Sequence, residues 1–278
     1  MESELPSITI VTPSFNQAQF LERTIRSVLD QEYPGLEYLV MDGGSADGSV
    51  EIIRRYAERL TYWTSGPDAG QAAAINAGWR MAQGEIIAWQ NSDDVYLPGA
   101  LQAAGQAFRD HPEAVLVYGQ TRRVDAEGHS LGTMGSAFRH RTLLYSHQLI
   151  PLPSAFFRRS AVEAVGMLDE SLHYSMDLDL LLRLAPIAPP LMLQLTLAEA
   201  TIHADAKTTR DRGIAAAETH RVRLRYARGV GALLVRAQPG LSWVFSQMPA
   251  WMRSALKRVR PQRVYEDGLS RPRSTQQP

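Results

Sequence analysis

The sequence predicts an α/β fold in which a mostly parallel central sheet is covered by helices on both faces and followed by a helical C-terminal extension. Short β-branched runs alternate with amphipathic helical segments through residues 1–110. The segments between successive runs span a dozen or more residues, as parallel strands require. This βαβ alternation is typical of architectures that bind nucleotides at one edge of the sheet.

The elements of residues 1–110 are each indicated by a local pattern. Residues 7–13 are rich in β-branched side chains and end at a proline, which predicts a first strand. Residues 20–29 place their apolar side chains on one face, which predicts an amphipathic helix. A second strand at 36–42 ends at Asp42, before a Gly-Gly turn. The remaining expected elements are a helix from 49, a strand at 60–64, a helix at 70–83 and a central strand at 86–89.

Residues 111–210 form the second half of the predicted domain, which spans 1–210. From residue 177 a stripe of leucines predicts a helix. Residues 213–236 predict a further helix in a C-terminal extension over 211–260. The polar tail at 261–278 is expected to be disordered. The other expected elements are a strand at 114–119, an extended turn at 120–133, a short helix at 139–149, a strand at 154–157 and one or two strands in 191–203.

The composition is that of a soluble globular protein. The chain has 278 residues, 45% hydrophobic and 21% charged, and no cysteine, which excludes disulfides and thiolate chemistry. The N-terminus lacks a basic segment followed by a long apolar run, and no apolar run reaches the length of a membrane span. The expected location is therefore the cytoplasm.

The zero net charge hides an asymmetry along the chain. Residues 207–278 carry 15 Lys/Arg against 4 Asp/Glu, whereas residues 1–206 carry 14 against 25. Within the basic part, 241–260 combines a helically spaced apolar face with flanking tryptophans and basic residues, a pattern typical of a helix lying in a membrane surface. Pro249 weakens that interpretation, and a helix docked on the domain fits equally well. Peripheral contact with the inner face of the membrane stays open, whereas nucleic-acid binding is not expected.

An Asp-Asp pair follows the central strand. The run 86–89 ends in Asn91, Ser92, Asp93 and Asp94. Two adjacent carboxylates at the carboxyl end of a buried strand suit a divalent ion that also binds phosphate. The alternative is a solvated turn or a helix cap. The chain lacks both GxxxxGK[ST] and a GxGxxG after the first strand, which argues against P-loop hydrolases and Rossmann dehydrogenases.

A second group of carboxylates surrounds the start of the helix expected from residue 177. Four carboxylates lie between residues 169 and 179. Asp177 falls in the first helical turn, where the helix dipole favours a negative charge. A catalytic base and a simple helix cap are both compatible with this position.

Together these motifs resemble family 2 glycosyltransferases, inverting enzymes of the GT-A fold that use nucleotide-sugar donors. The resemblance covers about residues 7–205 and rests on the segments 10–53, 65–94 and 176–185. By resemblance, a loop bordering the nucleotide is formed by Thr12, Pro13 and Ser14. Further donor-site positions implied in the same way are Asp42 at the base, Asp68, Gln71 and Asn76 in the pocket, and Asp93 at the ribose.

The resemblance also implies the catalytic groups. Asp94 stands where the family holds its metal, Mn²⁺ or Mg²⁺, and His203 stands near the metal or the diphosphate, although a lone histidine is often structural. Asp177 stands at the catalytic base. Many members carry Glu before that Asp, whereas this chain has Met176, which leaves Asp179 as an alternative.

The expected activity is metal-dependent transfer of a sugar, with inversion, from a nucleoside diphosphate to a hydroxyl of a saccharide or lipid-linked saccharide. Carboxylates accept hydrogen bonds from a neutral base and a ribose, which favours a UDP-sugar over dTDP- or GDP-sugars. Family analogy suggests a role in cell-envelope or extracellular polysaccharide synthesis. One alternative is a non-catalytic sugar-nucleotide-binding scaffold. A nucleotidyltransferase is disfavoured, because the loop TPSFNQ has neither glycine nor lysine.

Overall fold

The computed structural model describes residues 4–145, 150–203, 210–229, 231–233 and 235–236. The strands and helices given below belong to one compact unit that ends at Val235. The segments 241–260 and 261–278, for which a membrane-contacting helix and a disordered tail are expected, lie outside the described residues. Within the described part of the chain, no helix is both long and apolar enough to cross a bilayer.

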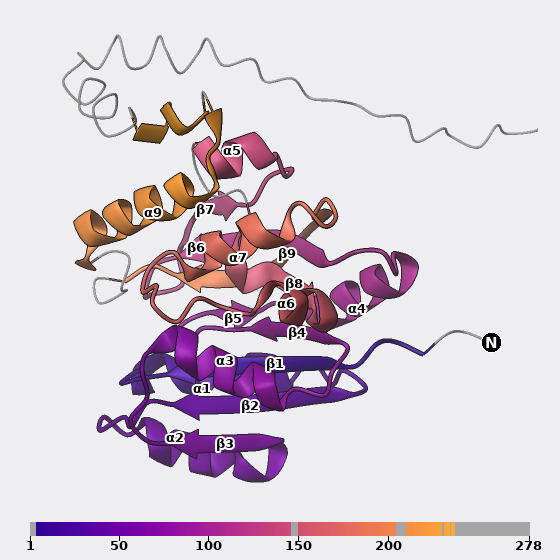
Figure 1. The fold of residues 1–278 in the computed structure, drawn as a ribbon. Helices are drawn as coiled ribbons and strands as arrows, with labels where there is room; N and C mark the ends of the chain where they lie inside the picture. The colour runs from indigo at the N-terminus through magenta and orange to yellow at the C-terminus, as the bar shows by residue number, and fades with distance from the viewer. Residues whose placement is uncertain (1–3, 146–149, 204–209, 230, 234, 237–278) are drawn as a thin grey trace, which may run out of the picture. The chain divides into compact units, whose positions relative to one another are not determined.

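The N-terminal half of the sheet is parallel, with strand order β3-β2-β1-β4 (Figure 1). Ser14 pairs with Asp42, and Asp42 pairs with Ser65, so these three strands end together and their following loops meet at one edge. The elements of this half are β1 (Ile8–Ser14), α1 (Ala18–Leu29), β2 (Leu36–Asp42), α2 (Ser49–Tyr56), η1 (Ala57–Arg59), β3 (Tyr62–Ser65), α3 (Gln71–Met81) and β4 (Ile86–Trp89).

The sheet continues from β4 in the order β8-β6-β9-β5, with β7 paired to β6. β6 and β9 are parallel, whereas β8, β5 and β7 run antiparallel to their neighbours. The mostly parallel sheet is thus confirmed, with antiparallel strands in its C-terminal half. The elements of this half are β5 (Val95–Tyr96), α4 (Ala100–Asp110), β6 (Leu116–Val124), β7 (Ser130–Met134), α5 (His140–Tyr145), η2 (Leu152–Ser154), β8 (Ala155–Arg158), α6 (Arg159–Val165), α7 (Met176–Leu184), β9 (Leu191–Thr201) and α9 (Arg212–Tyr226).

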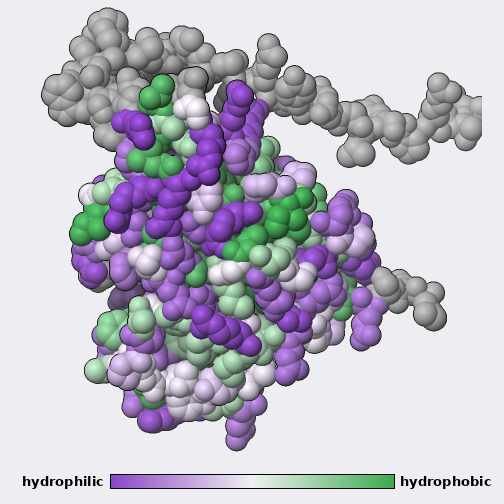
Figure 2. Space-filling view, viewed as in Figure 1, coloured by the Kyte–Doolittle hydropathy of each residue, from purple (hydrophilic) through white to green (hydrophobic). Residues whose placement is uncertain are grey.

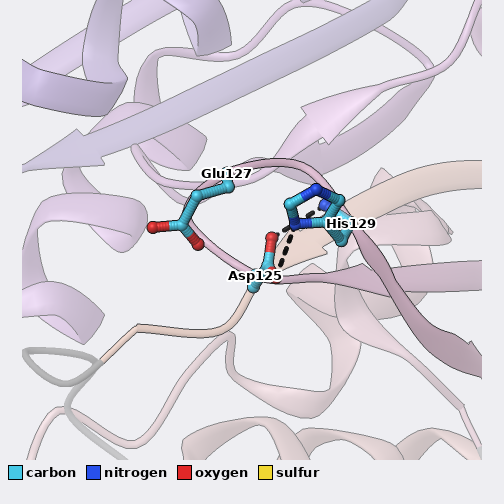
Figure 3. Close-up of side chains that lie close together, drawn as sticks. All are labelled: Asp125, Glu127 and His129. Atoms are coloured by element: carbon cyan, nitrogen blue, oxygen red, sulfur yellow. Dashed lines mark hydrogen bonds and ion pairs between the residues drawn. The ribbon is translucent and has the colours of Figure 1, made fainter.

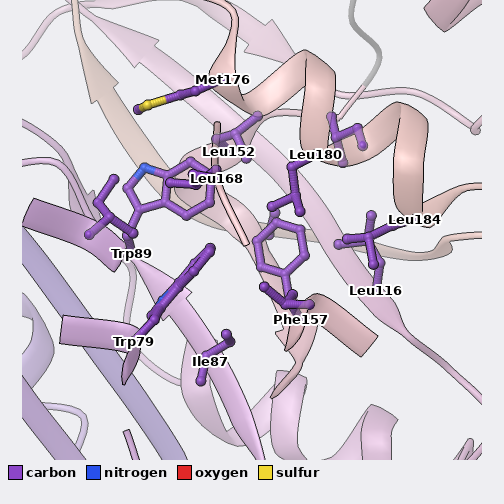
Figure 4. Close-up of a cluster of buried hydrophobic side chains, with 14 of the residues drawn as sticks. Trp79, Ile87, Trp89, Leu116, Leu152, Phe157, Leu168, Met176, Leu180 and Leu184 are labelled. Atoms are coloured by element: carbon purple, nitrogen blue, oxygen red, sulfur yellow. The ribbon is translucent and has the colours of Figure 1, made fainter. Parts of the chain in front are cut away.

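Helices cover both faces of the sheet because successive strand residues point to opposite sides. Ile86 and Ala88 pack in the core beneath α1, α2 and α4, whereas Ile87 and Trp89 pack with α3, α5, α6, α7 and α9. In the core that contains Ile87 and Trp89, the ring of Trp89 stacks on Phe157, with ring centroids 5.7 Å apart (Figure 4). This packing fixes the end of β4, from which the Asp-Asp pair projects.

The C-terminal extension departs from the expected single helix over 213–236. α9 ends at Tyr226, because Ala227 is extended with ψ 136° and Gly229 has a left-handed φ of 52°. α9 packs against α7 and α5 within the compact unit. Figure 2 shows a face that is largely hydrophilic, with apolar side chains in separate patches. Exposed apolar residues of the extension include Ile214 and Leu233.

Candidate active site

A cavity of about 880 Å³ opens where the carboxyl ends of β1, β2 and β4 meet. Its walls come from loops far apart in the sequence, since residues from β1 to the segment beyond β9 contribute side chains. The lining residues are Pro13, Ser14, Phe15, Gln17, Gly43, Pro67, Asp68, Gly70, Gln71, Ala74, Trp89, Asn91, Ser92, Asp93, Asp94, Leu152, His173, Tyr174, Met176, Asp177, Ala200, Thr201, Ile202 and Arg210.

Asp94 is the buried member of the acidic pair, with 6% of its surface exposed. Its Oδ2 accepts a hydrogen bond from Asn91 Nδ2 at 3.0 Å, and its Oδ1 accepts one from the Thr201 backbone N–H at 3.2 Å. Burial, and then the neighbouring charge of Asp93, raise the pKa of the Asp94 carboxyl well above its usual range. A positive ion beside the pair would relieve this repulsion.

His203 follows β9 and lies against the other member of the pair. Its Nε2 is 3.0 Å from Asp93 Oδ2, and its ring packs on Phe20 with centroids 4.6 Å apart. Its Nδ1 is buried, with no hydrogen-bond partner among the described residues. The end of β9 thus brings Thr201 onto Asp94 and His203 onto Asp93. The expected roles, Asp94 with His203 at the metal and Asp93 at the ribose, stay predictions.

Asp177 and Asp179 have different surroundings. Asp177 lies in the first turn of α7 and lines the cavity, where its Oδ1 accepts the backbone N–H of Leu178 at 2.7 Å. Asp179 is 2% exposed, and its carboxylate accepts hydrogen bonds from Arg183 Nε at 2.8 Å and from the Tyr226 hydroxyl at 2.7 Å. Asp179 is not among the cavity-lining residues. The geometry therefore favours Asp177 as the carboxylate that can meet a substrate.

The loop after β1 divides into buried and cavity-facing positions. Pro13 and Ser14 line the cavity, and Ser14 Oγ is buried without a hydrogen-bond partner among the described residues. Thr12 is fully buried and shares a hydrogen bond of 2.9 Å with the Tyr38 hydroxyl. Thr12 therefore supports the strand end instead of forming the wall.

Asp42, expected at the nucleotide base, is 2% exposed and already accepts several hydrogen bonds. Its Oδ2 accepts the backbone N–H groups of Gly44 at 3.1 Å and Ser45 at 2.9 Å, and the hydroxyl of Ser65 at 2.6 Å. The carboxylate thus holds the turn beside Gly43, which does line the cavity. A direct contact between Asp42 and the base stays a prediction.

Of the other predicted donor-site residues, Asp68 and Gln71 line the cavity and Asn76 does not. Gln71 Nε2 donates to Asn91 Oδ1 at 2.9 Å, which ties α3 to the acidic loop. Asn76 is 1% exposed and donates from Nδ2 to the Leu168 carbonyl and to Glu170 Oε1, both at 2.9 Å. These bonds attach the loop that follows α6 to α3, and a donor-site role for Asn76 stays a prediction.

The cavity wall also contains aromatic residues that belong to none of the predicted site positions. Phe15 follows β1 directly and is 61% exposed, although it lines the cavity beside Gly43. His173 and Tyr174 lie on the wall that carries Asp177. The signal for Phe15 was available in the sequence, since a large aromatic stands in an otherwise polar loop at a strand end.

Two smaller features of the described residues lie outside this cavity. A hollow of about 600 Å³ between α2 and β3 contains Glu51 and Arg54, which pair with each other at 3.6 Å. Asp125, Glu127 and His129 could surround an ion at the β6–β7 turn (Figure 3). There, however, Asp125 already accepts from the backbone and the ring of His129, as in an ordinary hairpin turn. Neither feature is therefore as good a candidate for the active site as the 880 Å³ cavity.

The fold and the site together define a glycosyltransferase of the GT-A type. Residues 9–166 match the family model "Glycosyl transferase family 2". An uncharacterized glycosyltransferase of Mycobacterium tuberculosis, Rv1514c, is 30% identical over 198 residues, which cover 70% of this chain and 74% of the relative. The chain belongs to glycosyltransferase family 2, as its motifs predict.

Solved structures show the same fold. Residues 1–349 of S. aureus TarS, in complex with UDP-GlcNAc, superpose with a TM-score of 0.63 at 15% identity, covering 78% of this chain and 65% of that chain. The mannosyltransferase PcManGT of Pyrobaculum calidifontis, in complex with GDP-Man and Mn²⁺, gives a TM-score of 0.61 at 17% identity, covering 92% of this chain and 80% of that chain. At these identities the likeness concerns the fold.

Proposed function

We propose that this chain transfers a sugar from a nucleoside-diphosphate donor to a hydroxyl acceptor, with inversion at the anomeric carbon. The observation that carries the proposal is that one cavity is lined both by the acidic pair after β4 and by Asp177 of α7. The first group suits a diphosphate with its metal, and the second suits an acceptor hydroxyl.

Asp177 is the proposed base. A sugar hydroxyl is a weak nucleophile, and a carboxylate within hydrogen-bond reach can take its proton as the new bond forms. The acceptor oxygen then bonds to the anomeric carbon as the bond to the nucleoside diphosphate breaks. A single displacement of this kind inverts the configuration. Hydrolysis generally needs two carboxylates facing each other across the scissile bond.

The residues at the end of β4 fit a divalent cation. Asp93 Oδ2 and His203 Nε2 converge to 3.0 Å, and a carboxylate oxygen with an imidazole nitrogen is a donor set that Mn²⁺ accepts. The repulsion between Asp93 and Asp94 adds a local demand for positive charge. We assign Asp93 and His203 as the ligands of Mn²⁺ or Mg²⁺, with Asp94 as their buried neighbour. A cation held there would offset the negative charge that develops on the departing diphosphate.

Phe15 is proposed to stack on the nucleotide base, because it is the exposed aromatic on the wall next to Asp68. Phe15→Ala is expected to weaken the binding of UDP or GDP by about 1–3 kcal/mol, the usual value of base–aromatic stacking. Isothermal titration calorimetry measures the change. Tyr62→Ala, which removes a 40% exposed aromatic of β3 outside the cavity, is the matched control. Equal effects of the two substitutions would contradict the stacking role.

A UDP-sugar remains the favoured donor, and the two structural neighbours were solved with UDP-GlcNAc and GDP-Man. The experiment that tests the function is a panel of UDP-, GDP- and dTDP-sugars, measured by thermal shift with and without Mn²⁺. We expect one nucleotide series to raise the melting temperature in a metal-dependent way. NMR of the product formed with that donor should then show inversion. The absence of a shift with every donor would contradict the proposed function. It would also contradict the non-catalytic scaffold, since such a scaffold must bind a sugar nucleotide.

The proposed acceptor is a saccharide or a lipid-linked saccharide. His173 and Tyr174 support this, since aromatic rings on the cavity wall can pack on the apolar face of a sugar ring. By family resemblance, the product would belong to a cell-envelope or extracellular polysaccharide. The proposed location is the cytoplasm, with peripheral contact at the inner face of the membrane. The scaffold alternative would bind donor without turnover.

A further inference from the structure

Glu218 of α9 is a buried carboxylate that lies outside the cavity and outside every motif of the sequence. It is 3% exposed. Three consecutive backbone N–H groups donate to it: His173 to Oε2 at 3.1 Å, Tyr174 to Oε1 at 2.6 Å and Ser175 to Oε1 at 2.8 Å. One side chain of the C-terminal extension therefore binds three successive peptide groups of a loop more than 40 residues earlier in the chain.

The Glu218 carboxylate is held in its charged form. Burial by itself would raise the pKa of Glu218, but the donors at Tyr174, His173 and Ser175 outweigh it and lower the pKa below its usual range. Hydrogen bonds to an ionised acceptor are about twice as strong as neutral ones. The loop is therefore attached to α9 by three charge-assisted bonds.

The attached loop leads directly into the proposed base. His173 and Tyr174 line the cavity, Ser175 is the N-cap residue of α7, and Asp177 stands in the first turn. The Ser175 side chain makes no capping bond within its own helix. Its hydroxyl instead shares a hydrogen bond of 2.8 Å with Thr219 Oγ1 of α9. The position at which α7 begins is thus set from α9.

Further contacts join α9 and its start to the same region on both sides of Glu218. The Tyr174 hydroxyl donates to Asp211 Oδ2 at 2.9 Å, and Arg225 donates to Asp169 Oδ2 at 2.7 Å. The Tyr226 hydroxyl donates to Asp179 of α7 at 2.7 Å. These contacts orient the helix, whereas the Glu218 carboxylate binds the backbone of the segment that precedes Asp177.

We infer that Glu218 is a positioning residue: it fixes the loop 173–175, which forms the acceptor wall of the cavity and sets where the Asp177 helix begins. The effect on transfer rests on the proposed function, but the fixing of the loop does not. Because the donor side is built from β1, β4 and α3, loss of Glu218 should spare nucleotide binding and impair the acceptor step.

The test uses the full chain with Glu218→Ala and Glu218→Gln. In the alanine variant the amides of 173–175 should exchange hydrogen about tenfold faster or more, since each lost bond to a charged group is worth a factor of that size. Glutamine can still accept from Tyr174 and Ser175 through one oxygen but presents an NH₂ group to His173. Its exchange rates should therefore fall between those of wild type and alanine.

Val222→Ala is the matched control, because Val222 is fully buried on the same helix and its apolar side chain cannot accept a hydrogen bond from the loop. It should lower the melting temperature without accelerating exchange at 173–175. For the Glu218 variants, calorimetry with UDP and GDP in Mn²⁺ should give Kd values near wild type, while kcat for transfer falls by about 10- to 100-fold through misplacement of the base.

Unchanged exchange at 173–175 in Glu218→Ala, or equal acceleration there in Val222→Ala, would overturn the inference. If Val222→Ala lowered kcat as much as the Glu218 variants, the role of Glu218 would be purely structural, and the inference would be overturned as well. Should the wild type transfer no sugar from any donor, the proposed function fails, and the exchange rates still decide whether Glu218 fixes the loop.

Discussion

Asp177→Asn is expected to lower the rate of sugar transfer by about 10²- to 10⁴-fold, the usual contribution of a general base. The amide keeps the size of the side chain and can still accept the Leu178 N–H, but it cannot take the proton of the acceptor hydroxyl. Donor binding should be unchanged, because the substitution does not touch the acidic loop after β4. Steady-state kinetics of nucleotide release, with calorimetry for donor affinity, separates the two quantities.

Asp179→Asn is the matched control for this prediction. Asp179 is buried and contacts Arg183 and Tyr226, so losing its charge should lower the free energy of unfolding by about 3–5 kcal/mol, as expected for a broken buried ion pair. Asp177→Asn should leave that free energy close to the wild-type value, as measured by urea denaturation. A larger rate loss in Asp179→Asn than in Asp177→Asn, with the protein folded, would transfer the role of base to Asp179.

The N-terminal half of the fold could be predicted closely because its signals are local. The strand at 36–42 is observed with those bounds, and the helix expected at 20–29 begins two residues earlier in the structure. In the C-terminal half, β5 has only two residues, too few for any periodicity to appear. The pairing of β8 between β4 and β6 joins distant segments and depends on tertiary packing, which no local pattern reports.

The candidate site was predictable where a strand end determines it. Pro13, Ser14 and Asp93 line the cavity because the sheet topology brings their loops to one edge. The contact between Asp93 and His203 spans 110 residues and depends on where β9 ends, so the sequence could not decide which carboxylate faces the histidine. Asn76 is assigned to the pocket by family resemblance alone, and its contacts with Leu168 and Glu170 span 92 and 94 residues, which no local pattern reports.

Asp93→Ala is expected to remove the metal-dependent part of donor binding. Losing one metal ligand should weaken Mn²⁺ binding by more than about 100-fold. Mutation of a residue that only hydrogen-bonds to a ligand already lowers metal affinity by about 10- to 100-fold. His203→Ala should have a smaller effect of the same kind, because the carboxylate remains. The measurement is the Mn²⁺ dependence of the thermal shift produced by the best nucleotide of the donor panel.

Asp94→Asn distinguishes this assignment from the one that the family resemblance implied. The amide oxygen can still accept the Thr201 N–H, so the loop should keep its shape, while the repulsion with Asp93 disappears. If Asp93 and His203 hold the ion, Asp94→Asn should retain metal-dependent binding that Asp93→Ala lacks. Replacing a metal ligand by an amide should cause a large loss of metal affinity, whereas replacing a buried neighbour should not. The opposite result would therefore return the metal to Asp94. The contact between Asp93 and His203 would then only support the acidic loop.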